Sequence, residues 1–462
     1  MRWLFLVCAS FFFYGWWDYR FLSLLLVSGL IDFFAALGMD RYPRARRSFL
    51  AFSLVGNLGI LFSFKYYGFF MENMESIADL FGMSLDGTVH TPEFMLILPL
   101  GISFYTFQSM SYTIDVYNGQ LKPTRSVLHF FAYLSLFPQL VAGPIIRARD
   151  MLPQLLTARP ITREARWEGM VLVVHGYFKK VVIADNLAMF VATAFADPVV
   201  SGSGIYWWLI ALAFTIQIYC DFSGYSDIAR GLAKWMGYDM QINFNHPYIA
   251  TSIQEFWDRW HISLTSWFRD YIFHGMVRKK IDQLRETGGQ LGQQRMIVYL
   301  WITMLLSGLW HGAAWHFILW GALHGLYLHI EIVTRWPMRM KKLFLGRWIA
   351  WLLTFFQVIV AMTIFRAQSL SQLGEILFRM LTFHNGLSLG LGEFLSIRDF
   401  GVISLLIGTV LLRELYMFTG LDRKMGSSAM GGFLGGPMVV ALMAIIAIYL
   451  RGSGAEFIYF QF

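Results

Sequence analysis

Hydrophobic residues in this chain gather in long uncharged runs that short polar segments separate. A run of about 20 apolar residues has the length of a helix that crosses a bilayer. After a first apolar and aromatic segment, Met1–Met39, the uncharged runs cover residues 48–64, 94–114, 126–146, 198–220 and 296–330, and further spans are expected at 348–365, 400–412 and 437–450. The pattern predicts an all-α polytopic membrane protein with about ten to twelve helices that enter the bilayer.

Composition supports this class. Hydrophobic residues make up 57% of the 462 residues, aromatic residues 18% and charged residues only 14%, more apolar surface than a soluble domain buries. The net charge of +8 comes from short basic clusters between the apolar runs, which is typical of cytoplasmic loops. In a nucleic-acid-binding protein the basic residues would line one exposed face instead, so nucleic-acid binding is not expected. Cys8 and Cys220 lie in apolar runs, and neither a disulfide framework nor a cysteine metal site is indicated.

Two features orient the first half of the chain. Met1–Met39 has no small-residue cleavage site after a basic start, so we interpret it as retained membrane helices and not as a signal peptide. The arginines within Arg41–Arg47 and those between Arg147 and Arg166 indicate cytoplasmic segments, the second with short amphipathic helices. The more polar stretch Met71–Glu93 is expected outside the membrane.

The runs 94–114 and 126–146 are long enough to span but contain helix breakers. Pro99 and Gly101 interrupt the first, and Pro138, Gly143 and Pro144 interrupt the second. Breakers at membrane depth are tolerated where the freed backbone groups face protein or a watery cavity. Both runs are therefore expected to form an internal wall instead of a lipid-facing surface.

The stretch Met296–Ile330 has 35 residues without Asp, Glu, Lys or Arg, yet it carries four histidines. As one helix it would measure about 52 Å against a hydrocarbon core of about 30 Å. Basic clusters at 278–285 and 335–342 flank it, so with both flanks cytoplasmic it must cross an even number of times or turn back. Gly308 and Gly312 bracket the midpoint. We predict a hairpin or kink with His311 at its inner end, reached from the cytoplasm through a cavity.

The segment Ile253–Ile272 has the periodicity of one amphipathic helix. At about 100° per residue its tryptophans and other apolar residues gather within roughly 120° of arc, opposite Glu255, Asp258 and Arg269. His261 falls just outside that stripe, roughly 20° beyond its edge. This position fits a boundary between water and an apolar cavity, or, as an alternative, a lipid headgroup.

Two carboxylates, Asp221 and Asp227, stand six residues apart just past the run 198–220. Carboxylates at that depth are expected to be paired or to line a polar cavity. The alternative is an interfacial turn capped by Ser223 and Ser226.

Five blocks of the sequence resemble the signature blocks of the membrane-bound O-acyltransferases, in particular the bacterial branch that acetylates alginate and other exported polysaccharides. The blocks are PLGISFYTFQSMSYTIDVY (99–117), LFPQLVAGPIIR (136–147), YCDFSGYSDIA (219–229), FNHPYIATSIQEFWDRWHISLTSWFRDYIF (244–273) and LSGLWHGAAWHFILWGALHG (306–325). The resemblance covers most of the chain, which we interpret as a single membrane domain, 1–462, with its signature core at about 95–330. One difference is the N-terminal region, which is short compared with members that carry an extra N-terminal hydrophobic segment. The first helix is therefore expected to be missing or differently placed.

The resemblance implies a ring of helices around a central funnel that holds two histidines, here His261 and His311. Neutral imidazole can accept the proton of a sugar hydroxyl as the hydroxyl attacks a thioester carbonyl. His311 is the predicted general base, and a covalent acyl-histidine is an open alternative. His261 is predicted to orient the substrate or to stabilise charge on the carbonyl oxygen. Trp310 and Trp260 are predicted to border the substrate and exclude water.

Other polar residues receive supporting roles. His246 precedes a proline in a polar loop and is expected to shape a cytoplasmic entrance. Ion pairs that hold the funnel are expected from Asp221, Asp227, Arg259, Arg269 and Asp270. His316, His324 and His329 follow His311 at spacings of 5, 8 and 5, which do not reproduce a two-histidine metal motif, so no metal is expected.

Two functions remain in competition. The first is an O-acyltransferase of the bacterial inner membrane that takes an acetyl group from acetyl-CoA or another acyl thioester and passes it to a polysaccharide, directly or through an extracytoplasmic SGNH-like acetyltransferase partner. The second is a transport or scaffold subunit of a polysaccharide export complex, in which broken helices form a conduit. Broken helices and buried histidines alone do not separate them, but the two histidines inside recognisable blocks favour the enzyme.

Overall fold

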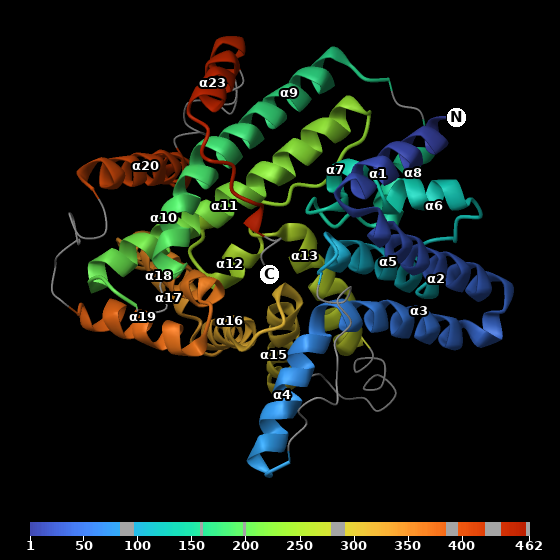
Figure 1. Cartoon of the computed structure of the whole chain (residues 1–462), viewed down its shortest axis with the longest axis horizontal. Coiled ribbons are helices and arrows are strands. Elements are labelled where there is room, and N and C mark those ends of the chain that lie inside the picture. Colours follow the sequence, from blue (N-terminus) through green and yellow to red (C-terminus); the bar gives the residue numbers. More distant parts are fainter. Residues whose placement is uncertain are drawn as a thin grey trace. The chain divides into compact units, whose positions relative to one another are not determined.

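The computed structural model describes residues 1–83, 97–157, 160–196, 200–278, 292–384, 396–420 and 436–458. Within these ranges the regular elements are helices and no strand occurs, which confirms the all-α prediction (Figure 1). Two compact units result: unit 1 comprises residues 1–166, 232–241 and 312–314, and unit 2 comprises residues 167–231, 242–311 and 315–462.

Six helical stretches are long and apolar enough to cross a membrane among the described residues. They are Arg2–Arg41, Pro43–Leu80, Gly204–Trp235, Trp315–Thr334, Gly346–Arg366 and Ile397–Thr419. The expected segments 1–39, 48–64, 198–220, 348–365 and 400–412 and the second half of 296–330 lie in or overlap these stretches, whereas 94–114, 126–146 and 437–450 do not. The chain is a polytopic membrane protein. The larger number of ten to twelve, which includes re-entrant helices, stays a prediction, as do the central funnel and the single domain.

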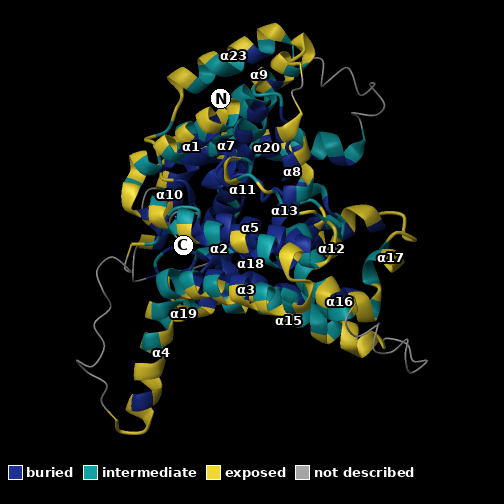
Figure 2. Cartoon of the chain, turned by 90° about the vertical axis from the view of Figure 1, so that its right-hand side faces the viewer, coloured by how far each residue is buried: buried dark blue, intermediate teal, exposed yellow. Residues whose placement is uncertain are grey.

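Unit 1 contains the first eight α-helices. They are α1 (Arg2–Asp18), α2 (Leu22–Arg41), α3 (Arg46–Leu61), α4 (Tyr67–Leu80), α5 (Ile102–Tyr117), α6 (Val127–Leu134), α7 (Phe137–Leu140) and α8 (Ala148–Leu156), with short helical turns at Tyr19–Phe21, Pro43–Ala45 and Phe62–Tyr66. Only Ala78 of α4 is buried, and Figure 2 shows this helix mostly in the colours of intermediate and exposed residues. Residues 84–93 of the stretch expected outside the membrane lie beyond the described residues.

A buried carboxylate joins three helices of unit 1. Asp32 of α2 accepts hydrogen bonds from the Ser53 hydroxyl and the Asn57 amide of α3, the latter at 3.0 Å, and from the hydroxyls of Ser109 and Thr113 of α5. All five side chains are buried. Hydroxyl and amide donors compensate for the desolvation of this carboxylate, so it fixes the registration of α2, α3 and α5.

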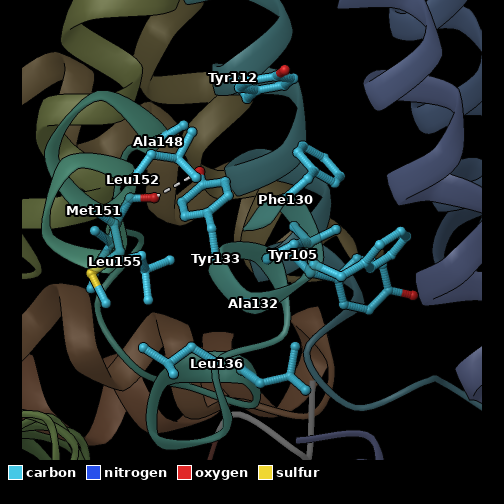
Figure 3. Close-up of a cluster of buried hydrophobic side chains, with 14 of the residues drawn as sticks. Tyr105, Tyr112, Phe130, Ala132, Tyr133, Leu136, Ala148, Met151, Leu152 and Leu155 are labelled. Atoms are coloured by element: carbon cyan, nitrogen blue, oxygen red, sulfur yellow. Dashed lines mark hydrogen bonds between the residues drawn. The ribbon is translucent and has the colours of Figure 1, made fainter. Parts of the chain in front are cut away.

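The run 126–146 does not form one crossing, as its apolar length suggested. It contains α6 and α7, and the chain breaks at Ser135 and Leu136, just before Pro138. The expectation of an internal wall is confirmed for unit 1, because Phe130, Phe131 and Tyr133 of this run are buried in the hydrophobic core, part of which Figure 3 shows. Tyr133 donates to the Ile146 carbonyl at 3.0 Å.

In the described part of the run 94–114, from residue 97 on, the helix begins only after Gly101. This residue has a φ of +71°, and a Cβ there would lie 2.6 Å from the carbonyl oxygen of Leu140. Glycine is therefore required both for the backbone angle and for the close approach to the end of α7. The helix that follows, α5, is almost entirely buried.

Unit 2 contains the remaining helices. They are α9 (Arg163–Tyr177), α10 (Asp185–Ala196), α11 (Gly204–Trp235), α12 (Ile253–Trp257), α13 (Ile262–Trp267), α15 (Gln293–His311), α16 (Trp315–Thr334), α17 (Trp336–Met340), α18 (Gly346–Arg366), α19 (Leu370–Thr382), α20 (Ile397–Thr419) and α23 (Pro437–Tyr449). The first four residues of α9 and the last four residues of α11 belong to unit 1. Shorter helical segments lie at Phe178–Ala184, Pro247–Ile249 and Phe268–Phe273.

Glycines set the closest helix contacts in unit 2. A Cβ on Gly176 of α9 would lie 2.5 Å from the Gly224 carbonyl oxygen of α11, and a Cβ on Gly231 would lie 2.5 Å from the Gly169 carbonyl oxygen. The two pairs repeat every seven residues along each helix. Small residues that let backbones approach are the usual basis of helix packing in membranes, and Figure 1 shows α9 and α11 side by side.

The stretch 296–330 turns back on itself, as predicted. α15 ends at His311, the chain turns over residues 312–314, and α16 begins at Trp315. The two helices pack closely, since a Cβ on Gly308 would lie 2.3 Å from the Phe317 carbonyl oxygen and one on Gly321 would lie 2.4 Å from the Met304 carbonyl oxygen. His311 therefore sits at the bend. The cytoplasmic location of both flanks stays a prediction, and Lys279, Lys280 and Arg285 lie outside the described residues.

This close packing predicts that Gly308→Ala destabilises the protein. The added methyl group overlaps the Phe317 carbonyl, so α15 and α16 must separate, at a cost of about 2 kcal/mol or more. Gly408→Ala in α20 is the matched control, because a Cβ there meets nothing within 4 Å. Thermal unfolding of both variants in detergent measures the difference. Equal melting temperatures would contradict the packing described for this hairpin.

Candidate active site

His261 lies at the junction of α12 and α13 and is fully buried. Its Nδ1 is 3.2 Å from Asn243 Oδ1, which also accepts hydrogen bonds from the Ser263 N–H at 3.1 Å and the Ser263 hydroxyl at 2.9 Å. The Asn243 amide nitrogen donates to Ser226 Oγ at 3.2 Å. This network assigns the Asn243 oxygen toward the histidine, so Nδ1 carries the proton and Nε2 is the nitrogen able to accept one.

The environment of His261 keeps the imidazole neutral. Burial lowers the pKa of His261 to about 3, with a small opposing effect of its backbone hydrogen bond. At neutral pH the ring is therefore uncharged and has a lone pair available. A lipid-headgroup position, the alternative left open by the sequence, is wrong because the side chain is not exposed.

The prediction of one amphipathic helix over Ile253–Ile272 is wrong. α12 ends at Trp257, His261 has a φ of +42°, and a new helix, α13, starts at Ile262. The break is stabilised because Asn243 accepts two of the first N–H groups of α13, that of Ile262 at its carbonyl oxygen and that of Ser263 at its side chain. The tryptophans of this segment are buried in unit 2 and do not form an interfacial surface.

His311 is the last residue of α15 and is 4% exposed. Its ring packs against Trp310 at 5.0 Å, Trp320 at 4.9 Å and Phe365 at 5.1 Å between centroids. Trp310 also contacts His261, at 6.0 Å. The two histidines, 50 positions apart in the sequence, therefore share Trp310 as an aromatic neighbour, and its predicted role of bordering the substrate stays a prediction.

The two histidines belong to a closed circuit of ring contacts with centroid distances between 4.7 and 6.3 Å. We call it the ring circuit; in order it passes through His261, Trp310, His311, Trp320, His324, Phe256, Trp260, Phe244 and back to His261. Trp260 thus belongs to the site through Phe244 and Phe256. Three of the eight rings are imidazoles, in surroundings that are otherwise aromatic.

A cavity of about 570 Å³ adjoins this circuit. From α15 it is lined by Leu300, Thr303, Met304 and Ser307, and from α16 by Leu328, Glu331 and Ile332, while α12, α13 and α17 contribute Gln254, Trp257, Leu264, Thr265 and Met338. Neither catalytic candidate lines it. The cavity is linked to His311 by ring contacts, because Trp257 of its lining packs against Trp320 and Trp320 packs against His311. The predicted access to His311 through a cavity stays a prediction.

Basic residues line the same cavity. Arg335 and Lys341 come from the cluster that follows α16, and Arg269 from the segment after α13, together with the acids Asp258 and Glu331. Arg335 and Lys341 belong to a cluster that the sequence assigns to the cytoplasmic side. The cavity therefore combines apolar walls with cations.

The carboxylates of α11 are paired, as predicted, and the interfacial-turn alternative is wrong because α11 continues through both of them. Asp227 accepts from Lys179 at 2.6 Å, and Asp221 pairs with Lys180 at 2.8 Å. Asp221 also accepts the N–H of Ile458 at 2.7 Å, and Lys180 donates to the Ala455 carbonyl at 2.9 Å.

These bonds hold the segment near the C-terminus against the site. Phe457 packs on Phe222 at 5.8 Å, and Phe222 packs on His261 at 4.6 Å. Both phenylalanines are buried. The structural-support prediction for Asp221 is thus consistent with a path of contacts that reaches one of the two histidines.

The other candidates do not belong to the ring circuit. Arg259 pairs with Glu255 at 2.9 Å, and Arg269 pairs with Asp270 at 3.2 Å. His246 Nδ1 lies 2.9 Å from Oε1 of Glu414, a buried residue of α20. Because His246 does not line the cavity, its entrance role stays a prediction.

Sequence reasoning missed two residues that shape the site. Asn243 lies in an aperiodic loop, where nothing in the pattern marks it. Glu331 had a signal, since it is the first carboxylate after the uncharged stretch 296–330. Its oxygens accept the backbone N–H groups of Ile253 at 2.5 Å and Gln254 at 3.1 Å, so it caps α12, the helix that carries Phe256 and Trp257 of the site.

Comparison with known sequences decides between the two functions left open. A sequence model of the membrane-bound O-acyltransferase family matches residues 121–371, more than half of the chain. The chain belongs to this family. With its six membrane-length helical stretches it is a multi-pass O-acyltransferase of the bacterial inner membrane, and the non-catalytic transport subunit is the weaker interpretation.

Three relatives illustrate the match. The chain is 40% identical to the probable alginate O-acetylase AlgI of Azotobacter vinelandii, over 82% of this chain and 72% of that protein. It is 37% identical to the probable alginate O-acetylase AlgI of Pseudomonas aeruginosa, over 90% and 76%. It is 36% identical to the peptidoglycan O-acetyltransferase of Helicobacter pylori, over 84% and 75%.

The position of Asn243 leads to a second prediction. Asn243→Ala removes the acceptor that holds His261 Nδ1–H and the first turn of α13, so we expect turnover to fall by about 10- to 100-fold. Thr409→Ala in α20 is the control, because its exposed hydroxyl donates to the Leu405 carbonyl of the same helix at 2.8 Å. Acetyl content of the cell-surface polymer, normalised to the amount of membrane-inserted protein, measures both. Unchanged acetylation in Asn243→Ala would contradict the positioning role.

Proposed function

We propose that this enzyme transfers an acetyl group from a cytoplasmic thioester to hydroxyl groups of an exported polysaccharide such as alginate. Two relatives are named as alginate O-acetylases and one as a peptidoglycan O-acetyltransferase, so acetylation of a carbohydrate polymer is the common element. The observation that carries the proposal is the shared contact of His261 and His311 with Trp310, beside a cavity with cationic lining.

The reaction assigns His311 as the general base. Its imidazole takes the proton of the attacking hydroxyl while the oxygen forms a bond to the thioester carbonyl carbon. The tetrahedral intermediate then expels sulfur as the C–S bond breaks, and the thiol receives the proton. In a covalent variant, the imidazole nitrogen first forms a bond to the acetyl carbon as the C–S bond breaks and the thiol leaves. The hydroxyl oxygen then bonds to the same carbon as the C–N bond breaks, and the imidazole is regenerated.

The protonation of His261 favours one of its two predicted roles. Its Nδ1–H donates to Asn243, so Nε2 acts as an acceptor and suits the orientation of a hydroxyl group. Stabilisation of an oxyanion requires a donor, which this tautomer does not offer at Nε2. We therefore assign His261 to holding the acceptor hydroxyl in line with the carbonyl carbon.

The cavity suits the donor. Its volume of about 570 Å³ falls in the range of small-molecule sites, and its walls are mainly apolar. Arg269, Arg335 and Lys341 at its lining match the phosphates that an acyl thioester such as acetyl-CoA carries. No bound cofactor is required, because the thioester enters as a co-substrate.

The acetyl group then has to reach a polymer outside the cytoplasmic membrane. We propose that it passes directly or through an extracytoplasmic SGNH-like acetyltransferase partner. Such a partner supplies its own nucleophilic hydroxyl, so the chemistry at His311 is the same for either acceptor.

The general-base assignment predicts the effect of removing one imidazole. His311→Ala is expected to insert normally but to lower acetylation of the surface polymer by about 100-fold or more. His329→Ala is the matched control from the same hairpin, because this half-buried ring accepts the Trp301 N–H at 3.3 Å and does not belong to the ring circuit. Acetate released from isolated polymer by mild alkali gives the readout. Wild-type acetylation in His311→Ala would reject the assignment.

The donor route makes a separate prediction about Ser307. Ser307→Phe fills the cavity one turn below His311, so we expect at least about a tenfold loss of acetylation with the protein still folded. Leu306→Phe is the control, because the Leu306 side chain, next to Ser307 in the sequence, is 40% exposed and does not line the cavity. Thiol release from acetyl-CoA in inverted membrane vesicles measures donor use. Equal rates in the two variants would place the donor elsewhere.

A further inference from the structure

Three buried rings in contact with one another, of which Trp257 lines the cavity, carry nitrogen atoms with no hydrogen-bond partner among the described residues. They are Trp257 of α12 and Trp320 and His324 of α16, which we call the nitrogen triad. Their exposed fractions are 5%, 1% and 0%. Trp257 and Trp320 each leave an indole N–H without an acceptor, and His324 leaves both ring nitrogens unbonded.

The triad is one compact cluster. His324 lies 5.0 Å from Trp257 and 4.7 Å from Trp320, and the two tryptophans are 5.6 Å apart, all in edge-to-face geometry. Two potential donors and an imidazole, which both donates and accepts, therefore meet in one place. Buried polar groups in native proteins are nearly always bonded, so a group of three without partners points to a ligand that supplies them.

Contacts of the triad also connect the cavity lining with His311. Along α16, Glu331, Leu328, His324 and Trp320 follow one another at helical spacing on one face, and the first two line the cavity. Trp320 packs against His311 at 4.9 Å, and Trp257 itself lines the cavity. Ring contacts thus lead from the cavity lining through Trp257 and Trp320 to the general base.

The chemistry of a thioester donor fits this position. The arm that ends in the reactive sulfur of coenzyme A, and of carrier proteins with the same prosthetic group, is a flexible pantetheine chain with two amide groups. Each amide offers a carbonyl acceptor and an N–H donor, while the rest of the arm is apolar. Two indole N–H groups bind carbonyl oxygens, and an imidazole nitrogen accepts an amide N–H.

We propose that Trp257, Trp320 and His324 bind the amide groups of the donor's pantetheine arm and so guide the thioester to His311. This inference rests on the proposed function, since it assumes a thioester donor, and it adds the part of the donor that the protein recognises. His324 is a donor-binding residue in this proposal and takes no proton from the acceptor hydroxyl.

A donor series with decreasing amide content tests the proposal in inverted membrane vesicles that hold the full-length protein and its acceptor. The donors are acetyl-CoA, S-acetylpantetheine with two amides, S-acetyl-N-acetylcysteamine with one, and S-acetyl-mercaptoethanol with none. The readout is thiol release that His311→Ala abolishes. For the wild type we expect kcat/KM to fall with each amide removed, by about tenfold per step.

The decisive variants remove the nitrogens but keep an aromatic ring at each position. In His324→Phe and in Trp257→Phe we expect about a tenfold lower kcat/KM for the two-amide donors and no change for the amide-free donor. His324→Gln, which retains a donor and an acceptor, should recover most of the loss. His329→Phe on the same helix is the control and should resemble the wild type, because its ring contacts Trp301 and lies outside the triad.

The outcomes separate the inference from the function on which it rests. If the triad variants lose activity equally with all four donors, the rings are packing elements only and the inference is wrong, although the acyltransfer stands. If the wild type releases no thiol from any donor, the thioester function itself fails. A similar series with an acetylated carrier protein in place of acetyl-CoA shows which source the protein uses, because both present the same arm.

Discussion

The close approach of α15 and α16 is the constraint on which the site depends. Gly308 and Gly321 let two backbones meet where any side chain would overlap a carbonyl oxygen, and this contact turns a stretch too long for one crossing back on itself. The bend puts His311 at the end of α15 and aligns two helical faces, one on each helix, that run from the cavity toward it. Without that contact, His311, the ring circuit and the cavity lining would not lie next to one another.

The second requirement is a neutral imidazole in a buried aromatic environment. His261 meets it because Asn243 accepts its Nδ1–H and burial opposes protonation, which lowers its pKa. Aromatic rings exclude water from a thioester that water would otherwise hydrolyse, yet they satisfy no hydrogen bonds. In such surroundings a few polar atoms therefore provide most of the hydrogen bonds. In our account these are Asn243, which positions His261, and the nitrogen triad, which binds the donor.

Much of this organisation was predictable from the sequence, and the failures have physical reasons. Hydrophobic runs identified the membrane helices, and the glycines near His311 identified the bend, because both signals are local. The periodicity of Ile253–Ile272 predicted one helix, but Asn243, a residue from a separate loop, supplies the hydrogen bonds that allow the break at His261. Pairing of Asp221 and Asp227 was expected from the cost of burying charge, whereas their partners Lys179 and Lys180 come from another segment. Contacts of this kind have no local pattern.

The central claim is that a thioester reaches His311 and His261 through the cavity beside α15 and α16. Cryo-electron microscopy of the protein with S-acetonyl-coenzyme A, whose carbon–sulfur bond cannot be cleaved by acyl transfer, tests it most directly. We expect the arm in the cavity and the carbonyl carbon at the ring circuit, with the carbonyl group about 3 to 4 Å from the His311 ring. An analogue bound elsewhere, with the circuit closed around both histidines, would contradict the account.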